Sequence, residues 1–193
     1  LGVGHSNSLG TGALTFNGGN LRTEVNNLVL TNAITLSNSS AITGTNNLIL
    51  SGNVQQQAGN RTLTISNTGT TLFNGTNFVL AEANQTRNLT VNVASGAGQV
   101  TISNTIQDGT GSGADGLIKT GGGTLVLGGS SSNTFTGATA VNGGTLVLAK
   151  SDNTPAISTN LTISNATVRL NAHQQMLTNS SINMFSASTL DLN

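Results

Sequence analysis

Asp108 and Asp115 are the only two acidic residues that lie close together in this 193-residue sequence. They flank the glycine-rich stretch Gly109-Thr-Gly-Ser-Gly-Ala114. A pair of carboxylates can perform acid/base hydrolysis of a glycoside, and carboxylates beside glycine turns can bind Ca²⁺. Calcium sites built from repeats recur along a chain, whereas this pattern occurs once. We therefore interpret residues 107–116 as a loop insertion.

The other residues that could do chemistry are dispersed. A Ser-His-Asp triad requires a serine near a histidine, but serine is so common here that its presence does not discriminate. We therefore assign no catalytic, cofactor-binding or metal-binding residue, and we expect a protein that is not an enzyme. The remaining acids and the histidines are Glu24, Glu82, Asp152, Asp191, His5 and His173.

The composition excludes several classes of protein. The formal net charge is zero, only 6% of residues are charged, and 35% are hydrophobic. A disordered chain combines low hydrophobicity with high net charge, and a nucleic-acid-binding protein needs a basic patch. No apolar run approaches the roughly 18 residues of a membrane-spanning helix. We expect neither a nucleic-acid partner nor a membrane span, and the absence of Cys excludes thiolate metal sites.

Short apolar segments recur at a nearly constant interval. The sequence GGTLVL occurs at Gly122–Leu127 and again at Gly143–Leu148. In the N-terminal half, Asn27–Leu30 recurs as Asn47–Leu50. Thr, Asn, Gly and Ser make up just over half of the chain, and these are poor helix formers. The repeats therefore predict strands.

About three strands fit into each interval, for example Ala33–Leu36, Ala41–Thr45 and Leu48–Leu50. Each alternates apolar and polar residues, as half-buried strands do, and Asn or Gly residues at the corners accept positive φ angles. Three strands coiled per turn make a parallel β-helix, a narrow coil whose core needs no large aromatic side chains. We predict a single segment over 1–193, with about nine turns of about 20–22 residues. A β-sandwich is a weaker alternative, because it would not repeat near-identical sequences at a fixed interval.

The stretch from Leu117 to Leu148 resembles the autotransporter-associated β-strand repeat. It contains Leu117-Ile-Lys-Thr-Gly-Gly-Gly-Thr-Leu-Val-Leu127, Asn133-Thr-Phe-Thr-Gly137 and Gly144-Thr-Leu-Val-Leu148, which follow the family pattern L-x-K-x-G-x-G-T-L-x-L … N-T-Y/F-T-G … G-T-L-x-L. The resemblance implies an all-β, right-handed parallel β-helix in the passenger of a bacterial surface protein. Such passengers are exported across the outer membrane by type V secretion. The family carries no shared catalytic residues.

Both ends of the sequence look like interior repeats. Residue 1 begins in repeat-like sequence without the pattern of a signal peptide, and residue 193 follows directly on a strand. Bare strand edges invite pairing. The preferred expectation is a piece of a longer chain, and the alternative is a subunit that stacks end to end.

Three functions fit these observations. The first is a stiff structural and adhesive rod, secreted or on the bacterial surface, whose partners are host cells or matrix, polysaccharide or sister chains. The second is a subunit of an extracellular filament formed by β contacts between chain ends. The third and weakest is a carbohydrate-active β-helix enzyme or tailspike, for which Asp108 and Asp115 are the one plausible pair.

Overall fold

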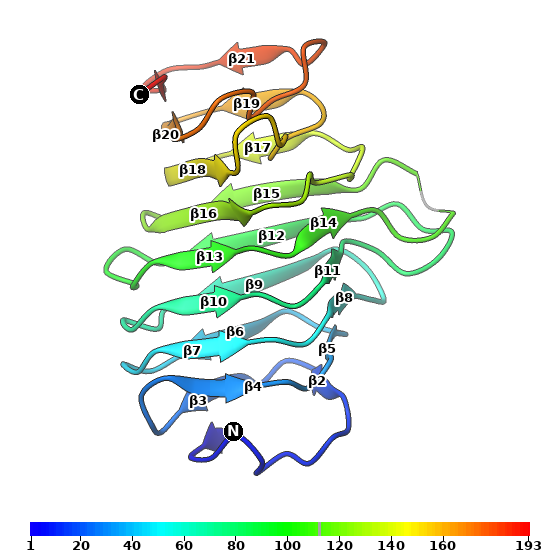
Figure 1. Cartoon of the computed structure of the whole chain (residues 1–193), viewed down its shortest axis with the longest axis vertical. Coiled ribbons are helices and arrows are strands. Elements are labelled where there is room, and N and C mark those ends of the chain that lie inside the picture. Colours follow the sequence, from blue (N-terminus) through cyan, green and yellow to red (C-terminus); the bar gives the residue numbers. More distant parts are fainter. Residues whose placement is uncertain (112) are drawn as a thin grey trace.

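The protein is a parallel β-solenoid, an elongated stack of turns with the N-terminus at one end (Figure 1). The computed structural model describes residues 1–111 and 113–193. Within those residues there is no helix, and the strands form three sheets of nine, eight and five strands. All pairings are parallel, as a coil requires. The all-β fold with about nine turns and three strands per turn is confirmed.

Each sheet runs along the long axis and takes one strand from each successive turn. The first sheet consists of β1 (Gly2–Val3), β3 (Asn20–Thr23), β6 (Ser40–Thr43), β9 (Arg61–Ile65), β12 (Asn88–Val93), β15 (Gly116–Thr120), β17 (Thr139–Val141), β19 (Leu161–Ile163) and β21 (Ile182–Met184). The second sheet consists of β4 (Leu28–Leu30), β7 (Leu48–Leu50), β10 (Thr71–Phe73), β13 (Val100–Ile102), β16 (Thr124–Gly129), β18 (Gly144–Lys150), β20 (Ala166–Leu170) and β22 (Thr189–Asp191). The third sheet consists of β2 (Leu14–Phe16), β5 (Ile34–Leu36), β8 (Val54–Gln56), β11 (Asn77–Val79) and β14 (Thr105–Gln107).

The repeats found in the sequence stack on one another in register. Leu28 pairs with Leu48 between β4 and β7, and Leu125 pairs with Leu146 between β16 and β18. Equivalent residues of successive turns thus lie directly above one another, as predicted.

The predicted constant interval is wrong in the middle of the chain, where the turns are longer. Leu89 pairs with Leu117, and Thr71 pairs with Val100, so each of these turns contains several more residues than the turn from Leu28 to Leu48. The longer turns carry the extra residues in loops outside the rungs, while the strands keep their pairing. A solenoid tolerates this because only the strands must stack, and loops can lengthen at little cost.

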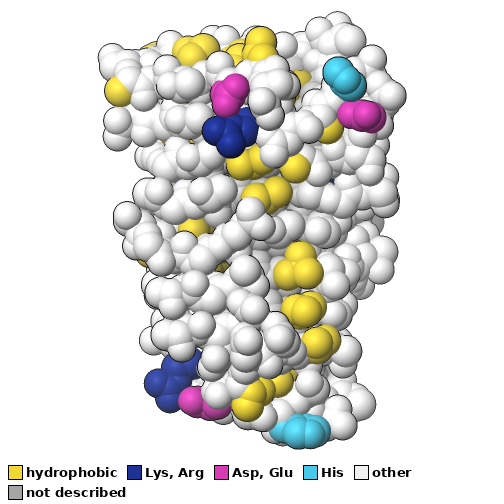
Figure 2. Space-filling view, turned by 60° about the vertical axis from the view of Figure 1, so that its left-hand side comes forward, with side chains coloured by type: hydrophobic (Ala, Val, Ile, Leu, Met, Phe, Trp, Pro, Cys, Tyr) yellow, Lys and Arg dark blue, Asp and Glu magenta, His cyan; other side chains and the backbone are white. Residues whose placement is uncertain are grey.

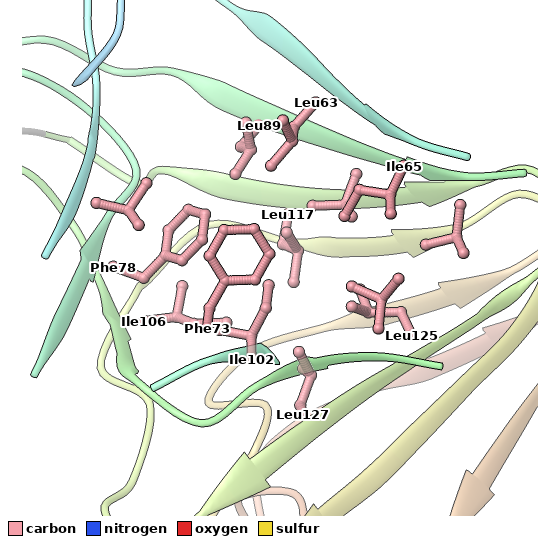
Figure 3. Packing of buried hydrophobic residues seen from close by; sticks show 14 of the residues in the cluster. Leu63, Ile65, Phe73, Phe78, Leu89, Ile102, Ile106, Leu117, Leu125 and Leu127 are labelled. Carbon is pink, nitrogen blue, oxygen red and sulfur yellow. The ribbon is translucent and has the colours of Figure 1, made fainter. Parts of the chain in front are cut away.

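The core fills the space between the three sheets (Figure 3). Strand residues alternate between buried and half-exposed positions, so the inward side chains form columns of Leu, Ile and Val. Phe73 and Phe78 meet edge to face with ring centroids 5.7 Å apart. The expectation that the core needs no aromatics is therefore wrong, because Phe16 and Phe135 are buried as well. A coil cross-section with three sheets leaves room at the corners for rings.

The third side of the coil changes character after β14. No strand is assigned there in the described residues after 107, and the chain runs irregularly through 133–135 and 155–157. Pro155, the one proline, lies on this side and has no N–H to donate to a ladder. Its carbonyl accepts a hydrogen bond from the Asn133 N–H at 3.0 Å. The side closes through single hydrogen bonds in place of a continuous sheet.

Candidate functional site

Asp108 and Asp115 do come together, and each holds backbone groups. Asp108 Oδ1 accepts the N–H of Asp115 at 3.1 Å, and Asp115 Oδ2 accepts the N–H of Gly109 at 2.9 Å. Asp115 Oδ1 also accepts the N–H of Arg87 at 2.7 Å. Asp115 is fully buried, and this burial raises the pKa of its carboxyl. The two carboxylates close the base of the glycine-rich loop, whose Ser112 lies outside the described residues.

Asp108 also ties this loop to the turn above it. Its Oδ2 accepts hydrogen bonds from the N–H of Thr136 at 3.0 Å and from the Thr136 hydroxyl at 2.7 Å. Both aspartates therefore act as hydrogen-bond acceptors for the chain itself, an arrangement that orders a loop.

A second inserted loop, at 80–87, lies against the glycine-rich loop. The N–H of Asn84 donates to the carbonyl of Thr110 at 2.9 Å. Glu82 Oε1 accepts hydrogen bonds from Arg87 Nη2 at 3.1 Å and from the N–H of Ala58 at 3.1 Å. The hydrogen bond from Arg87 lowers the pKa of Glu82. We call 80–87 and the described part of 107–116 the ledge; its loops project beyond β11 and β14 (Figure 1).

Sequence reasoning identified only one half of the ledge. The signal for the other half is the number of residues between equivalent strands. More residues separate Leu63 in β9 from its partner Val91 in β12 than separate Leu28 from Leu48. Two insertions of similar length in consecutive turns can stack, since each follows the rung to which it is attached. The ledge therefore forms because the coil stacks the two turns that carry the insertions.

The other candidate residues stay apart. His5 lies in the first turn and His173 near the last, at opposite ends of the rod. Asp152 Oδ1 accepts the backbone N–H of His173 at 2.9 Å, a proximity that follows from their separation by one turn. Glu24 pairs with Arg22 and Asp191 pairs with Arg169, both on the surface.

Two kinds of feature are absent from the described part of the chain. Among residues 1–111 and 113–193, no three His, Cys, Asp or Glu side chains gather as a metal ion would require. The same residues contain no helix that is long and apolar enough to span a membrane.

A fully buried lysine was not anticipated from the sequence. Lys119 lies in β15 with its Nζ among the backbone carbonyls of one corner. It donates to Thr120 O at 2.8 Å, Gly121 O at 2.9 Å and Gly143 O at 3.1 Å. The ammonium thus satisfies carbonyls of two successive turns. The K-x-G spacing of the motif is the signal that places it.

Lys150, at the end of β18, is buried in the same manner. Its Nζ donates to Gly128 O at 2.8 Å and to Asn104 O at 3.4 Å. Among the ion pairs of the described residues none involves either lysine. Burial without a counter-charge lowers the pKa of both lysines to about 8.

Buried amide side chains hold the third side where the sheet has ended. Asn133 Oδ1 accepts the N–H of Ile106 at 2.9 Å, and its Nδ2 donates to Ala156 O at 2.8 Å. Two turns later, the fully buried Gln175 accepts the N–H of Lys150 at 2.8 Å. Each amide takes the place of a backbone rung, because it offers one acceptor and one donor.

These residues lie in or beside a recognisable segment. Residues 117–148 match the family model described as passenger-associated-transport-repeat. The resemblance to an autotransporter repeat is confirmed over this segment. In it Lys119 and Asn133 satisfy backbone groups of neighbouring turns, so the residues that define the repeat build the coil. No curated protein and no solved structure matches the chain.

The outer face of the second sheet carries a different kind of feature. Parallel register stacks the outward side chains Val29, Ile49, Leu72, Thr101, Val126 and Val147 in one column. We call this column the apolar ladder. Figure 2 shows a line of hydrophobic side chains along the long axis of this face, with a basic and acidic pair near its C-terminal end. The column is half-buried and is interrupted by Thr101, and an apolar column on the outer face of a sheet is a candidate interaction site.

Proposed function

We propose that this chain is a structural and adhesive module of an exported bacterial protein. The passenger-associated repeat at residues 117–148, built into a parallel β-solenoid, carries the proposal. Such repeats occur in autotransporter passengers, which supports a function outside the cell. A stiff rod of this type presents long faces to host cells, polysaccharide or sister chains.

Surface display of the chain tests this function. The chain is expressed with its native export machinery, or fused to a heterologous one, and labelled on intact cells by an antibody. The displaying cells are expected to bind epithelial monolayers, immobilised polysaccharide or one another more than cells that display an unrelated solenoid. Exclusive recovery from the cytoplasm under native expression contradicts the proposal.

We propose further that the module acts by binding, without catalysis. The carboxylates of Asp108 and Asp115 are engaged by backbone N–H groups, which supports a role in loop order. The opposing hypothesis of a carbohydrate-active enzyme predicts cleavage of some glycan, lost in Asp115→Asn. A panel of linear polysaccharides assayed for new reducing ends or unsaturated uronate separates the two.

A further inference from the structure

The apolar ladder is a contact surface that the family pattern does not explain. Leu125 and Leu127 of the motif point inward, whereas Val126 between them points outward. The ladder members are half-buried, except for Val147 at 9% exposure. Five of the six positions are Val, Ile or Leu, although polar residues are the usual choice on the outer face of a sheet.

Charge sets where the ladder ends. The same column continues from Val147 to Arg169 and then to Asp191, whose side chains pair at 2.8 Å. From Val29 to Val147 the column holds no charge. The neutral portion of the column therefore ends, on its C-terminal side, at a solvent-exposed ion pair, which would lose hydration if a partner covered it.

We infer that the apolar ladder binds the apolar ladder of a second copy of this chain, in antiparallel orientation. This inference rests on the proposed adhesive function and names one surface for its sister-chain partner. The spacing of the rungs supports the choice of partner, because a second solenoid has the same interval of about 4.8 Å between side chains of the column. The ridges of one ladder can fit between those of the other over the whole overlap.

Orientation follows from the ends of the column. If two copies run parallel with their rungs in register, Arg169 lies opposite Arg169 and like charges face each other. If they run antiparallel about an axis between Leu72 and Thr101, Val29 lies opposite Val147 and Ile49 opposite Val126. The Arg169–Asp191 pairs then lie beyond the overlap and stay solvated.

The size of the surface predicts a weak contact. Six rungs and the outward residues on either side cover about 30 Å by about 17 Å, or about 1,000 Å² over two copies. This is at the lower end of specific interfaces, so the dissociation constant is expected to be micromolar or weaker. Several modules in series would strengthen it by avidity.

Sedimentation velocity of the purified chain up to about 0.5 mM tests the contact. The wild type is expected to form dimers, and Leu72→Arg and Val126→Arg are each expected to raise the dissociation constant at least tenfold. Ile118→Arg is the matched control, because Ile118 is an outward, half-buried residue on the first sheet. Circular dichroism establishes that each variant is folded. Equal effects of all three substitutions, or a monomeric wild type, overturn the inference.

Disulfide trapping tests the orientation. The chain has no cysteine, so introduced thiols report only on the contact. A mixture of Val29→Cys and Val147→Cys is expected to form a crosslinked heterodimer under mild oxidation, and Val29→Cys alone to form little. Efficient homodimers of Val29→Cys overturn the antiparallel arrangement. A wild-type chain that does not self-associate, while displaying cells still bind monolayers or polysaccharide, would overturn this inference and leave the adhesive function standing.

Discussion

The solenoid closes its third side in two different ways along its length. From β2 to β14 the side is a backbone ladder of five strands. After β14 it is held by single backbone hydrogen bonds and by buried side chains, of which Asn133 and Gln175 bond to several backbone groups. One cross-section can thus be maintained either by sequence-tolerant backbone pairing or by particular residues.

The two regions also differ in where they place charge. All three buried charged residues, Asp115, Lys119 and Lys150, follow β14 in the described part of the chain. The first turns keep charge outside, as in the exposed Arg22–Glu24 pair. The repeat-bearing region therefore depends on specific side chains, and we expect it to be the more sensitive to pH and to substitution.

The largest expected effect is a rise in stability at alkaline pH. Lys119 and Lys150 have a pKa of about 8 in the folded protein and 10.5 as the ordinary value. Between these values the unfolded chain binds more protons, so the free energy of unfolding increases with pH. Over the whole interval we expect a gain of about 7 kcal/mol for both lysines, measured by chemical denaturation at several pH values.

A double variant serves as the control for that experiment. Lys119→Met with Lys150→Met is expected to lose the alkaline rise, whatever its stability at neutral pH. The chain has no Cys and no Tyr, so apart from the α-amino group no other group titrates in this interval. A flat profile of the wild type would show that the lysines are not desolvated.

Gly121→Ala is expected to destabilise the protein by about 3 kcal/mol. Gly121 has φ +76°, and an added Cβ would lie 2.2 Å from Val93 O in the turn below. Gly12→Ala, at a position with open space around it, is expected to be neutral. Thermal unfolding of both variants measures the difference, and equal melting temperatures contradict it.

Asn133→Leu is expected to cost about 2 to 3 kcal/mol, because it leaves the N–H of Ile106 and the carbonyl of Ala156 without partners. Gln55→Leu is the control on the third sheet, where the amide is half-exposed and the backbone ladder carries the pairing. It is expected to change stability by less than about 0.5 kcal/mol. Similar losses in urea denaturation would erase the distinction between the two regions.

The smallest effect is expected for the charges on the first turns. Glu24→Gln removes an ion pair whose two side chains are 58% and 45% exposed. Exposed pairs contribute about 0 to 1 kcal/mol, and we expect about 0.3 kcal/mol, reduced further by salt. A loss above about 1 kcal/mol at moderate salt would mean that the N-terminal region also depends on specific charged contacts.

Prediction from the sequence succeeded where the information is local. Alternation within segments such as Leu48–Leu50 identified the strands, and the repeated GGTLVL identified which strands stack. It failed on the middle turns, where the loop at 80–87 lengthens the interval without changing the strands. It also failed on Lys119, because the K-x-G spacing of the motif does not by itself show that the lysine will find a carbonyl of the turn above.

The sequence by itself determined the all-β coil, its stacking and the absence of charge along most of its surface. These follow from alternation and composition, which act over a few residues at a time. Only the tertiary structure decided that Asp108 and Asp115 clasp a loop, that Asn133 substitutes for a rung, and that outward residues align as the apolar ladder. Each of these depends on which residue lies above which. That register is set by the lengths of the loops, which cannot be read from the sequences of the strands.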